Sequence, residues 1–208
     1  MICLVTDRRV FAGDAPDDEA AVDRLLAVIE ACAGAGVDLV QIRETGLTDR
    51  RLLALVEEAL ARTRGTGARV VVNDRADIAL AAGAAGVHLK DDARDAARIR
   101  GMGPLDWLVG RSVHDVATAR AAASSGVDYL VAGTVHASES KPGREPLGLE
   151  GLRAIVVAAA PCPVLAIGGV SAGNVRAVAK TGAAGVAGIR LFRTDRLGDT
   201  IATLRGAF

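Results

Sequence analysis

One stretch in the C-terminal third of the chain has residue types that suit a phosphate site. The apolar run Val164–Ile167 is followed at once by Gly168 and Gly169, and Ser171 stands two residues further on. The run predicts a strand buried on both faces, and Ser171 predicts the N-cap of a following helix. Backbone N–H groups at the start of a helix bind phosphate, so the stretch predicts an anion site. A tight turn without any ligand would have the same pattern.

Polar and charged side chains also gather where other apolar runs end. Arg and Lys neutralise phosphoryl charge, and Asp supplies the hard oxygen ligands that Mg²⁺ prefers. Together they favour a phosphorylated, metal-bound substrate. The candidates at these positions are Gln41, Arg43, Asn73, Asp74, Asp91, Asp92, Arg111, Ser112, His114 and Lys141.

Eight short apolar runs alternate with segments of helical periodicity, and these elements would position the polar side chains. Such alternation implies a parallel sheet, and eight units close into a (β/α)₈ barrel with its chemistry at the C-terminal ends of the strands. A doubly wound open sheet is the alternative, although it rarely needs eight units. The expected strands are residues 2–6, 37–42, 70–72, 87–89, 107–110, 127–132, 164–167 and 185–191.

Residues that favour helix N-termini precede several of the helical segments. Asp17, Thr48, Asp115 and Ser171 are N-cap types, and each is expected to open a helix, as Asp195 is for the last one. A Gly-Val pair recurs before the second, fourth, sixth and eighth expected strands, which suits a barrel built of quarter-units. Because neither a linker nor a low-complexity tract divides the sequence, residues 1–208 are expected to form one domain.

The composition excludes several classes of partner. Lys plus Arg and Asp plus Glu number 25 each, so the formal net charge is zero, and only 2% of the residues are aromatic. This balance argues against nucleic-acid binding, which needs basic surfaces and stacking side chains. The three cysteines lack disulfide or zinc spacing, and neither a signal peptide nor a membrane span is evident. We expect a cytoplasmic protein without nucleic-acid or membrane partners, and a homo-oligomer would be compatible with it.

Six segments occur in an order typical of one family. They are QIRE (41–44), NDRADIA (73–79), GVHL (86–89), GRSVH (110–114), SKPG (140–143) and AIGG (166–169). With these segments the chain resembles the thiamine phosphate synthase/TenI family, and the resemblance extends over residues 4–192, nearly the whole chain. Each segment is weak by itself, whereas six in the family's order are specific.

The resemblance implies one of two activities. A thiamine phosphate synthase joins hydroxymethylpyrimidine diphosphate to a thiazole phosphate, releases pyrophosphate and uses Mg²⁺. A thiazole tautomerase aromatises the thiazole carboxylate phosphate with a His acid/base and no metal. We expect the synthase, acting on small phosphorylated pyrimidine and thiazole substrates with Mg²⁺. The tautomerase and a non-catalytic binder of thiazole phosphate are the alternatives.

The resemblance also implies roles for individual residues. Matching positions in the family hold the diphosphate and the pyrimidine, bind magnesium, or contact the thiazole phosphate through backbone amides. The expected catalytic residues are Arg43, Lys141 and His136, the further substrate-binding residues are Gln41, Asn73, Arg111, Ser112, Gly168 and Gly169, and the metal ligands are Asp74 and Asp92.

Some positions depart from the family pattern. Thr45 stands where a lysine is usual, and Ala93 takes the second metal position unless a one-residue deletion brings Asp92 into it. The late phosphate-binding segment lacks its Ser and contains Arg190, which could supply the missing contact. These departures weaken the match to the synthase.

Other positions bear on the choice between the two activities. Asp74 favours the synthase, whereas Arg111 is more typical of the tautomerase branch. The catalytic His of that branch falls on Thr134, which leaves His136 or His114 as the acid/base.

Structural roles are the alternatives for several of these side chains. Asp74 could cap the helix expected from Ala76, and Arg43 could simply pair with Glu44 or Asp74. His88 could plug the end of the barrel or bond to the backbone.

Overall fold

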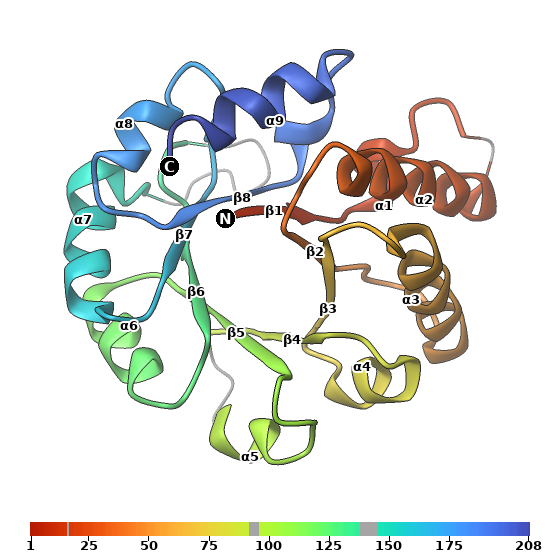
Figure 1. Ribbon diagram of the computed structural model, residues 1–208, viewed down its shortest axis with the longest axis horizontal. Coiled ribbons are helices and arrows are strands. Elements are labelled where there is room, and N and C mark those ends of the chain that lie inside the picture. Colours follow the sequence, from red (N-terminus) through yellow and green to blue (C-terminus); the bar gives the residue numbers. More distant parts are fainter. Residues whose placement is uncertain (16, 92–95, 138–144) are drawn as a thin grey trace.

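The computed structural model shows a closed parallel barrel (Figure 1). It describes residues 1–208 apart from 16, 92–95 and 138–144. The strands pair in chain order, and the last one closes on the first. The predicted (β/α)₈ fold is therefore confirmed. The strands are β1 (Ile2–Val5), β2 (Leu39–Ile42), β3 (Arg69–Asn73), β4 (Gly86–Leu89), β5 (Leu108–Val113), β6 (Tyr129–Gly133), β7 (Val164–Ile167) and β8 (Gly185–Gly188).

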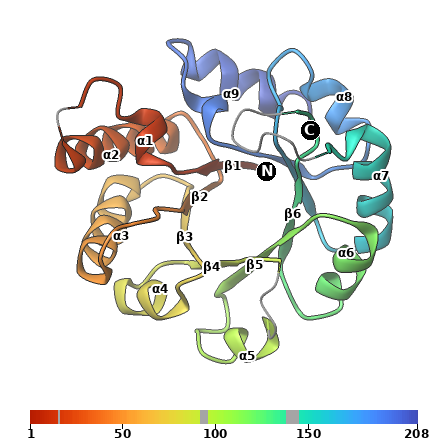
Figure 2. The same cartoon turned by 180° about the vertical axis from the view of Figure 1, so that it is seen from behind.

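Helices surround the barrel on its outer side, as both views show (Figure 1, Figure 2). They bury aliphatic residues such as Leu25, Ile29 and Leu55 in one core with the outward faces of the strands, which removes apolar surface from water. None of the helices in the described part of the chain is long and apolar enough to cross a membrane. The helices are α1 (Arg8–Phe11), α2 (Asp18–Gly34), α3 (Asp49–Thr63), α4 (Ala76–Ala82), α5 (Ala96–Arg100), α6 (Val116–Ala123), α7 (Gly148–Ala159), α8 (Val175–Ala179), the 3-10 helix η1 (Arg190–Phe192) and α9 (Leu197–Arg205).

Three predicted helix starts are confirmed. The side chains of Asp17, Thr48 and Asp115 accept hydrogen bonds from backbone N–H groups in the first turns of α2, α3 and α6. Asp115 also forms a capping box with Thr118, which satisfies N–H groups that the helix would otherwise leave unpaired. The cap at Asp115 therefore anchors the segment that follows β5.

The predicted starts of the last two helices are wrong. Helix α8 begins at Val175, and Ser171 lies before it in a turn, where its N–H donates to Asn174 Oδ1 at 2.8 Å. Helix α9 begins at Leu197 and not at Asp195. The Asn side chain thus forms a local turn in place of the expected Ser cap. The glycine pair after β7 is separated from the helix by this turn.

Strand β5 extends three residues beyond its predicted end at Gly110. Arg111 and Ser112 pair with Leu130 and Val131 of β6, so both lie within the barrel wall and not in the loop after it. Because successive side chains of a strand point to opposite faces, only one of the two can face the barrel interior. Strand β8 is shorter than predicted, because η1 follows in place of its last residues.

A row of residues crosses four neighbouring strands inside the barrel. The register pairs Asn73 with His88, His88 with Gly110, and Gly110 with Tyr129. A Cβ at Gly110 would lie 2.1 Å from Cζ of Tyr129, closer than two carbon atoms can approach. Glycine at this position therefore lets the Tyr129 ring reach across β5 toward His88, with the ring centroids 5.5 Å apart. Aliphatic residues and a cysteine fill the interior around Tyr129, namely Cys3, Val5, Leu39, Val71, Val131, Leu165 and Ala187.

Candidate active site

Two adjoining cavities open at the C-terminal ends of the strands, where barrels of this type carry out their chemistry. The polar cavity has a volume of about 360 Å³, and the glycine cavity beside it has about 430 Å³. Both are bordered by Asp7, Ile167, Gly168 and Ile189, so ligands bound in the two would be neighbours. The polar cavity is lined by Gln41, Arg43, Thr45, Asn73, His88, Ser112, His114 and Thr134, and the glycine cavity by Gly168, Gly169, Gly188 and Arg190.

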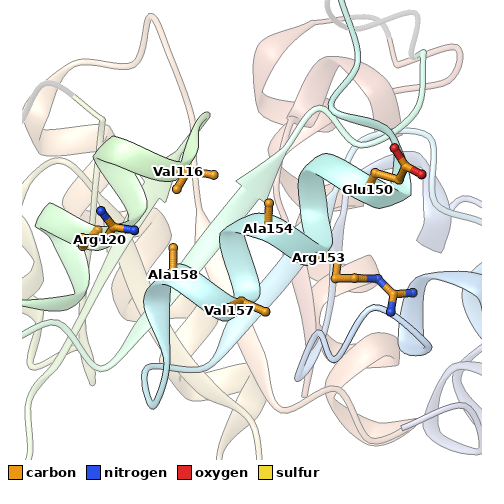
Figure 3. A pocket seen from close by; sticks show the side chains of 7 residues that line it. All are labelled: Val116, Arg120, Glu150, Arg153, Ala154, Val157 and Ala158. Atoms are coloured by element: carbon orange, nitrogen blue, oxygen red, sulfur yellow. The ribbon is translucent and has the colours of Figure 1, made fainter.

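A larger hollow lies on the outside of the barrel. It has a volume of about 740 Å³, and its lining residues all belong to α6 and α7. Figure 3 shows Val116 and Arg120 of α6 on one side of it, and Glu150, Arg153 and other residues of α7 on the other. Size alone does not identify the site, because the polar groups at the strand ends gather in the smaller cavities.

Gln41 and Asn73 form an amide pair in the wall of the polar cavity. Gln41 Nε2 donates to Asn73 Oδ1 at 3.0 Å, and Gln41 is only 3% exposed. This bond leaves the Gln41 oxygen as an acceptor and the Asn73 amide nitrogen as a donor for another partner. The structure thus brings these two predicted substrate-binding residues together.

His88 also lines the polar cavity, with polar groups on both ring nitrogens. Its Nε2 lies 3.0 Å from Ser112 Oγ, and its Nδ1 lies 3.2 Å from the Tyr129 hydroxyl. Burial lowers the pKa of His88 from 6.5 to about 4, so the ring is neutral at neutral pH. The sequence did not reveal the contact to Tyr129, because a single Tyr in an apolar strand is typical of a core residue.

The glycine pair after β7 adopts backbone conformations that side chains rarely take. The φ angle is +96° at Gly168 and +63° at Gly169. A Cβ at Gly168 would lie 2.5 Å from Cγ2 of Thr134, and one at Gly169 would lie 2.6 Å from Cβ of His136. Both positions therefore require glycine. The predicted helix start behind them is absent at Ser171, so phosphate binding at this turn would depend on the glycine backbone itself.

Arg43 is exposed and lines the polar cavity. Its backbone N–H donates to Thr6 Oγ1 at 2.9 Å. The alternative role, an ion pair with Glu44, is not observed among the described residues, where Glu44 Oε2 contacts the buried Arg8 at 3.3 Å. Arg8 also donates to the carbonyl oxygen of Thr45 at 3.0 Å. The buried guanidinium therefore holds the loop that presents Arg43 to the cavity.

Asp74 has neither of the structural roles considered for it. Helix α4 has Arg75 at its N-cap, without a capping side chain, and the Asp74 carboxylate forms an ion pair with Lys90 and not with Arg43. Asp74 has a φ of +65°, and its backbone N–H donates to the carbonyl oxygen of His88 at 2.8 Å. Its carboxylate thus lies at the end of β3 beside a lysine from the end of β4.

Comparison with known proteins identifies the family. The family described as "Thiamine monophosphate synthase" matches residues 10–192. The chain belongs to this family. A thiamine-phosphate synthase of Methanoculleus marisnigri is 39% identical over 88% of this chain and 83% of its own length. Another, of Gloeobacter violaceus, is 40% identical over 80% of this chain and 48% of its own length. The solved structure of thiamine phosphate pyrophosphorylase from Pyrococcus furiosus superposes with a TM-score of 0.81, at 29% identity, over 99% of this chain and 94% of that one.

In this thiamine monophosphate synthase family member, β5 divides its polar residues between two faces. Ser112 lines the polar cavity, whereas Arg111 Nη2 donates to the Asp91 carbonyl oxygen at 2.8 Å. His114, just after β5, also lines the cavity, with Nδ1 2.5 Å from Gly133 O and Nε2 3.2 Å from Asp91 Oδ2. The structure therefore brings Ser112 and His114 to the cavity and directs Arg111 toward the connection after β4.

The segment after β6 contains the position that the resemblance implies for the tautomerase His. Thr134, at that position, lines the polar cavity and is 6% exposed. The backbone N–H of His136 donates to Gly168 O at 3.0 Å. Its Nε2 atom is buried without a hydrogen-bond partner among the described residues, and the residue lines neither of the two cavities. Its catalytic role stays a prediction.

Two predicted site residues, Lys141 and Asp92, lie outside the described residues. Within the part of the chain that the structure describes, His, Cys, Asp and Glu side chains form no group of three that could hold a metal ion. Of the two predicted magnesium ligands, Asp74 can be placed, and it lies next to Asn73 of the polar cavity.

Proposed function

We propose that the chain is a thiamine-phosphate synthase, which joins hydroxymethylpyrimidine diphosphate to a thiazole phosphate and releases pyrophosphate. The observation that supports this proposal best is the shared border of the two cavities at Ile167, Gly168 and Ile189. Two phosphorylated rings bound in these cavities would meet at that border. Holding two reactants in contact removes much of the entropic barrier to joining them. Membership of the thiamine monophosphate synthase family supports the same activity.

The pyrimidine ring suits the polar cavity. An aminopyrimidine presents a ring-nitrogen acceptor next to an exocyclic N–H donor. The Gln41 oxygen would accept from the amino group, and the Asn73 amide and the Ser112 hydroxyl are the donors on the same cavity. Val5 and Val131 also line this cavity and offer apolar contacts to the ring faces.

The reaction requires negative charge to be neutralised on the leaving group. The C–O bond between the pyrimidine methylene and the diphosphate breaks, and its electron pair leaves with pyrophosphate. The thiazole nitrogen then donates its lone pair to the methylene cation and forms the C–N bond. Arg43, exposed on the polar cavity, would neutralise the departing charge together with Lys141.

The thiazole phosphate suits the glycine cavity. Gly168, Gly169 and Gly188 line it, and the absence of side chains at these residues lets a phosphate approach the backbone. Arg190 lines the same cavity and would provide a cation where the family usually has a serine. We therefore assign the thiazole phosphate to this cavity.

Magnesium suits the diphosphate end of the polar cavity. In sites of this kind Mg²⁺ is held by one or two carboxylates together with substrate phosphates and water. Asp74 would provide one carboxylate and Asp92 the second. When bound, the ion would neutralise charge on the departing pyrophosphate. Asp74 would then exchange its Lys90 partner for the ion.

Thiazole tautomerisation is the second candidate, because His114 lines the polar cavity. That reaction moves a proton at carbon and calls for a group that titrates near neutral pH. A non-catalytic binder of thiazole phosphate, the remaining alternative, would need only the glycine cavity as its binding site.

One pair of assays separates these functions. The purified protein receives both ring substrates with Mg²⁺, and thiamine phosphate and pyrophosphate are quantified. A second sample receives the thiazole carboxylate phosphate, and loss of the dihydrothiazole form is followed. If the protein is a synthase, the first assay should yield equal amounts of thiamine phosphate and pyrophosphate, and the dihydrothiazole form should persist in the second. Turnover in the second assay alone would establish the tautomerase, and binding of thiazole phosphate without any turnover would establish a binder.

A further inference from the structure

The row formed by His88, Gly110 and Tyr129 connects the barrel interior with the polar cavity. His88 and Ser112 line that cavity, whereas Tyr129 is 1% exposed and packs among apolar side chains such as Leu39. The Tyr129 ring reaches His88 only because Gly110, between them in the register, has no side chain. The contact is thus built into the barrel wall.

The Tyr129 hydroxyl has one hydrogen-bond partner among the described residues, Nδ1 of His88 at 3.2 Å. A buried O–H group that does not donate its hydrogen leaves an unsatisfied donor, which is costly. If Nδ1 carried a hydrogen, the hydroxyl could only accept, and its own hydrogen would face apolar side chains. Tyr129 is therefore the donor in this bond, and Nδ1 of His88 is the acceptor.

The direction of this bond determines the next one. An imidazole with a free lone pair on Nδ1 is neutral and carries its hydrogen on Nε2. Nε2 then donates to Ser112 Oγ at 3.0 Å. Because that oxygen already accepts from His88, the hydrogen of the Ser112 hydroxyl is left for a partner in the polar cavity.

We propose that Tyr129 is a positioning residue that fixes His88 as the Nε2–H tautomer and so makes the Ser112 hydroxyl a hydrogen-bond donor to the ligand. The ligand atom that Ser112 meets is then an acceptor. We assign this acceptor as an unprotonated ring nitrogen of the pyrimidine, an assignment that rests on the proposed function. With the Gln41 oxygen as an acceptor in the same cavity, the site recognises the acceptor and donor of an aminopyrimidine edge.

The tautomer can be measured directly by ¹⁵N NMR of protein labelled at its histidines. The chain has three His residues and one Tyr, so a His88→Gln variant identifies the His88 signals. The wild type should show a protonated Nε2 and an unprotonated Nδ1. Tyr129→Phe removes only the hydroxyl, and the Nδ1–H tautomer should then become detectable.

Thr63→Val is the matched control for this measurement. It removes another buried hydroxyl, which donates to the Ala59 carbonyl oxygen at 2.9 Å at the end of α3. This variant should leave the His88 signals unchanged. A protonated Nδ1 in the wild type, or an identical tautomer in Tyr129→Phe, would overturn the role of Tyr129. Neither result depends on the reaction that the protein catalyses.

Calorimetry with two probes identifies the ligand atom. Tyr129→Phe and Ser112→Ala should each weaken binding of free hydroxymethylpyrimidine about 5-fold, as expected for one hydrogen bond, and leave pyrophosphate binding unchanged. Weakened pyrophosphate binding with normal pyrimidine binding would overturn the ring-nitrogen assignment in favour of a phosphoryl oxygen. A wild type that binds neither probe would count against the proposed function, and the NMR result would still decide the role of Tyr129.

Discussion

The carboxylate of Asp74 forms an ion pair with the ammonium group of Lys90, across the ends of β3 and β4. Asp74 is the predicted magnesium ligand, and Lys90 directly follows β4. The Lys90 side chain is 60% exposed, and ion pairs open to solvent are weak. If Asp74 holds Mg²⁺ as proposed, the ion would have to displace the lysine, and the magnesium requirement would be higher than without it.

Lys90→Met should lower the Mg²⁺ concentration for half-maximal synthase activity about 3-fold, because the ion no longer competes with an ammonium group for Asp74. Lys90→Arg keeps the positive charge, so its Mg²⁺ concentration for half-maximal activity should stay near the wild-type value. Initial rates over a Mg²⁺ titration measure both variants. An unchanged magnesium requirement in Lys90→Met would show that the Asp74 carboxylate does not hold the ion.

Asp74→Asn should raise the magnesium requirement about tenfold or more, since a neutral amide is a poorer ligand for a hard cation. Asn is preferable to Ala because φ at this position is +65°, in the left-handed region that Asn tolerates. Asp23→Asn, at an exposed position of α2, is the control for loss of one surface charge. Full wild-type turnover in excess chelator would contradict the metal role.

Arg43→Met should reduce kcat/KM for the diphosphate substrate about 10²-fold, because the charge that develops on pyrophosphate loses a cation. Arg43→Lys should retain part of the activity. Arg62→Met is the control, because Arg62 lies on α3 and forms an exposed ion pair with Glu30 of α2. This variant should keep wild-type kinetics. Wild-type kcat/KM in Arg43→Met would rule out the proposed role of Arg43.

Gly168→Ala should destabilise the fold by about 1–3 kcal/mol, through an unfavourable backbone conformation. The φ of +96° and the clash of a Cβ with Thr134 at 2.5 Å are the structural causes. Gly67→Ala is the control, because a Cβ there meets no atom within 4 Å. Thermal unfolding compares the two variants, and equal melting temperatures would show that the turn after β7 is not strained by a side chain.

Arg8→Met should destabilise the protein by about 3 kcal/mol or more at neutral pH, because it leaves Glu44 buried without its cation. Burial already raises the pKa of Glu44 above its ordinary 4.5, and loss of Arg8 raises it further. A raised pKa in the folded state means that the folded protein binds more protons above pH 4.5, so this contribution to stability falls as the pH rises.

The loss in free energy of unfolding caused by Arg8→Met should therefore be smallest below pH 4.5, the ordinary pKa of the Glu44 carboxyl. It should increase toward neutral pH. Denaturant unfolding at several pH values measures it. Arg62→Met, in an exposed pair, should change stability little at any of them. If the stability lost in Arg8→Met did not vary with pH, Glu44 would not be the group that is left unpaired.

The sequence by itself determined the barrel and the end of it that holds the site. Apolar runs and helical periodicity are local patterns, and their eightfold alternation leaves few topologies. Because the ends of parallel strands meet at one edge, the same patterns placed Gln41, Asn73 and Ser112 together before any contact was known. The glycine pair after β7 was likewise evident from the residue types, whereas the positive φ angles and the close approach of Thr134 and His136 that require glycine there were not.

Only the tertiary structure decided which side chains meet. The contact of Tyr129 with His88 depends on the register across Gly110, and the pairing of β5 with β6 decides that Ser112 lines the cavity while Arg111 contacts Asp91. These relations join residues far apart in the chain. A shift of one residue in strand register moves every side chain to the opposite face. Strands buried on both faces, such as β1, β2 and β4, lack the alternation of apolar and polar residues that would indicate the register from the sequence.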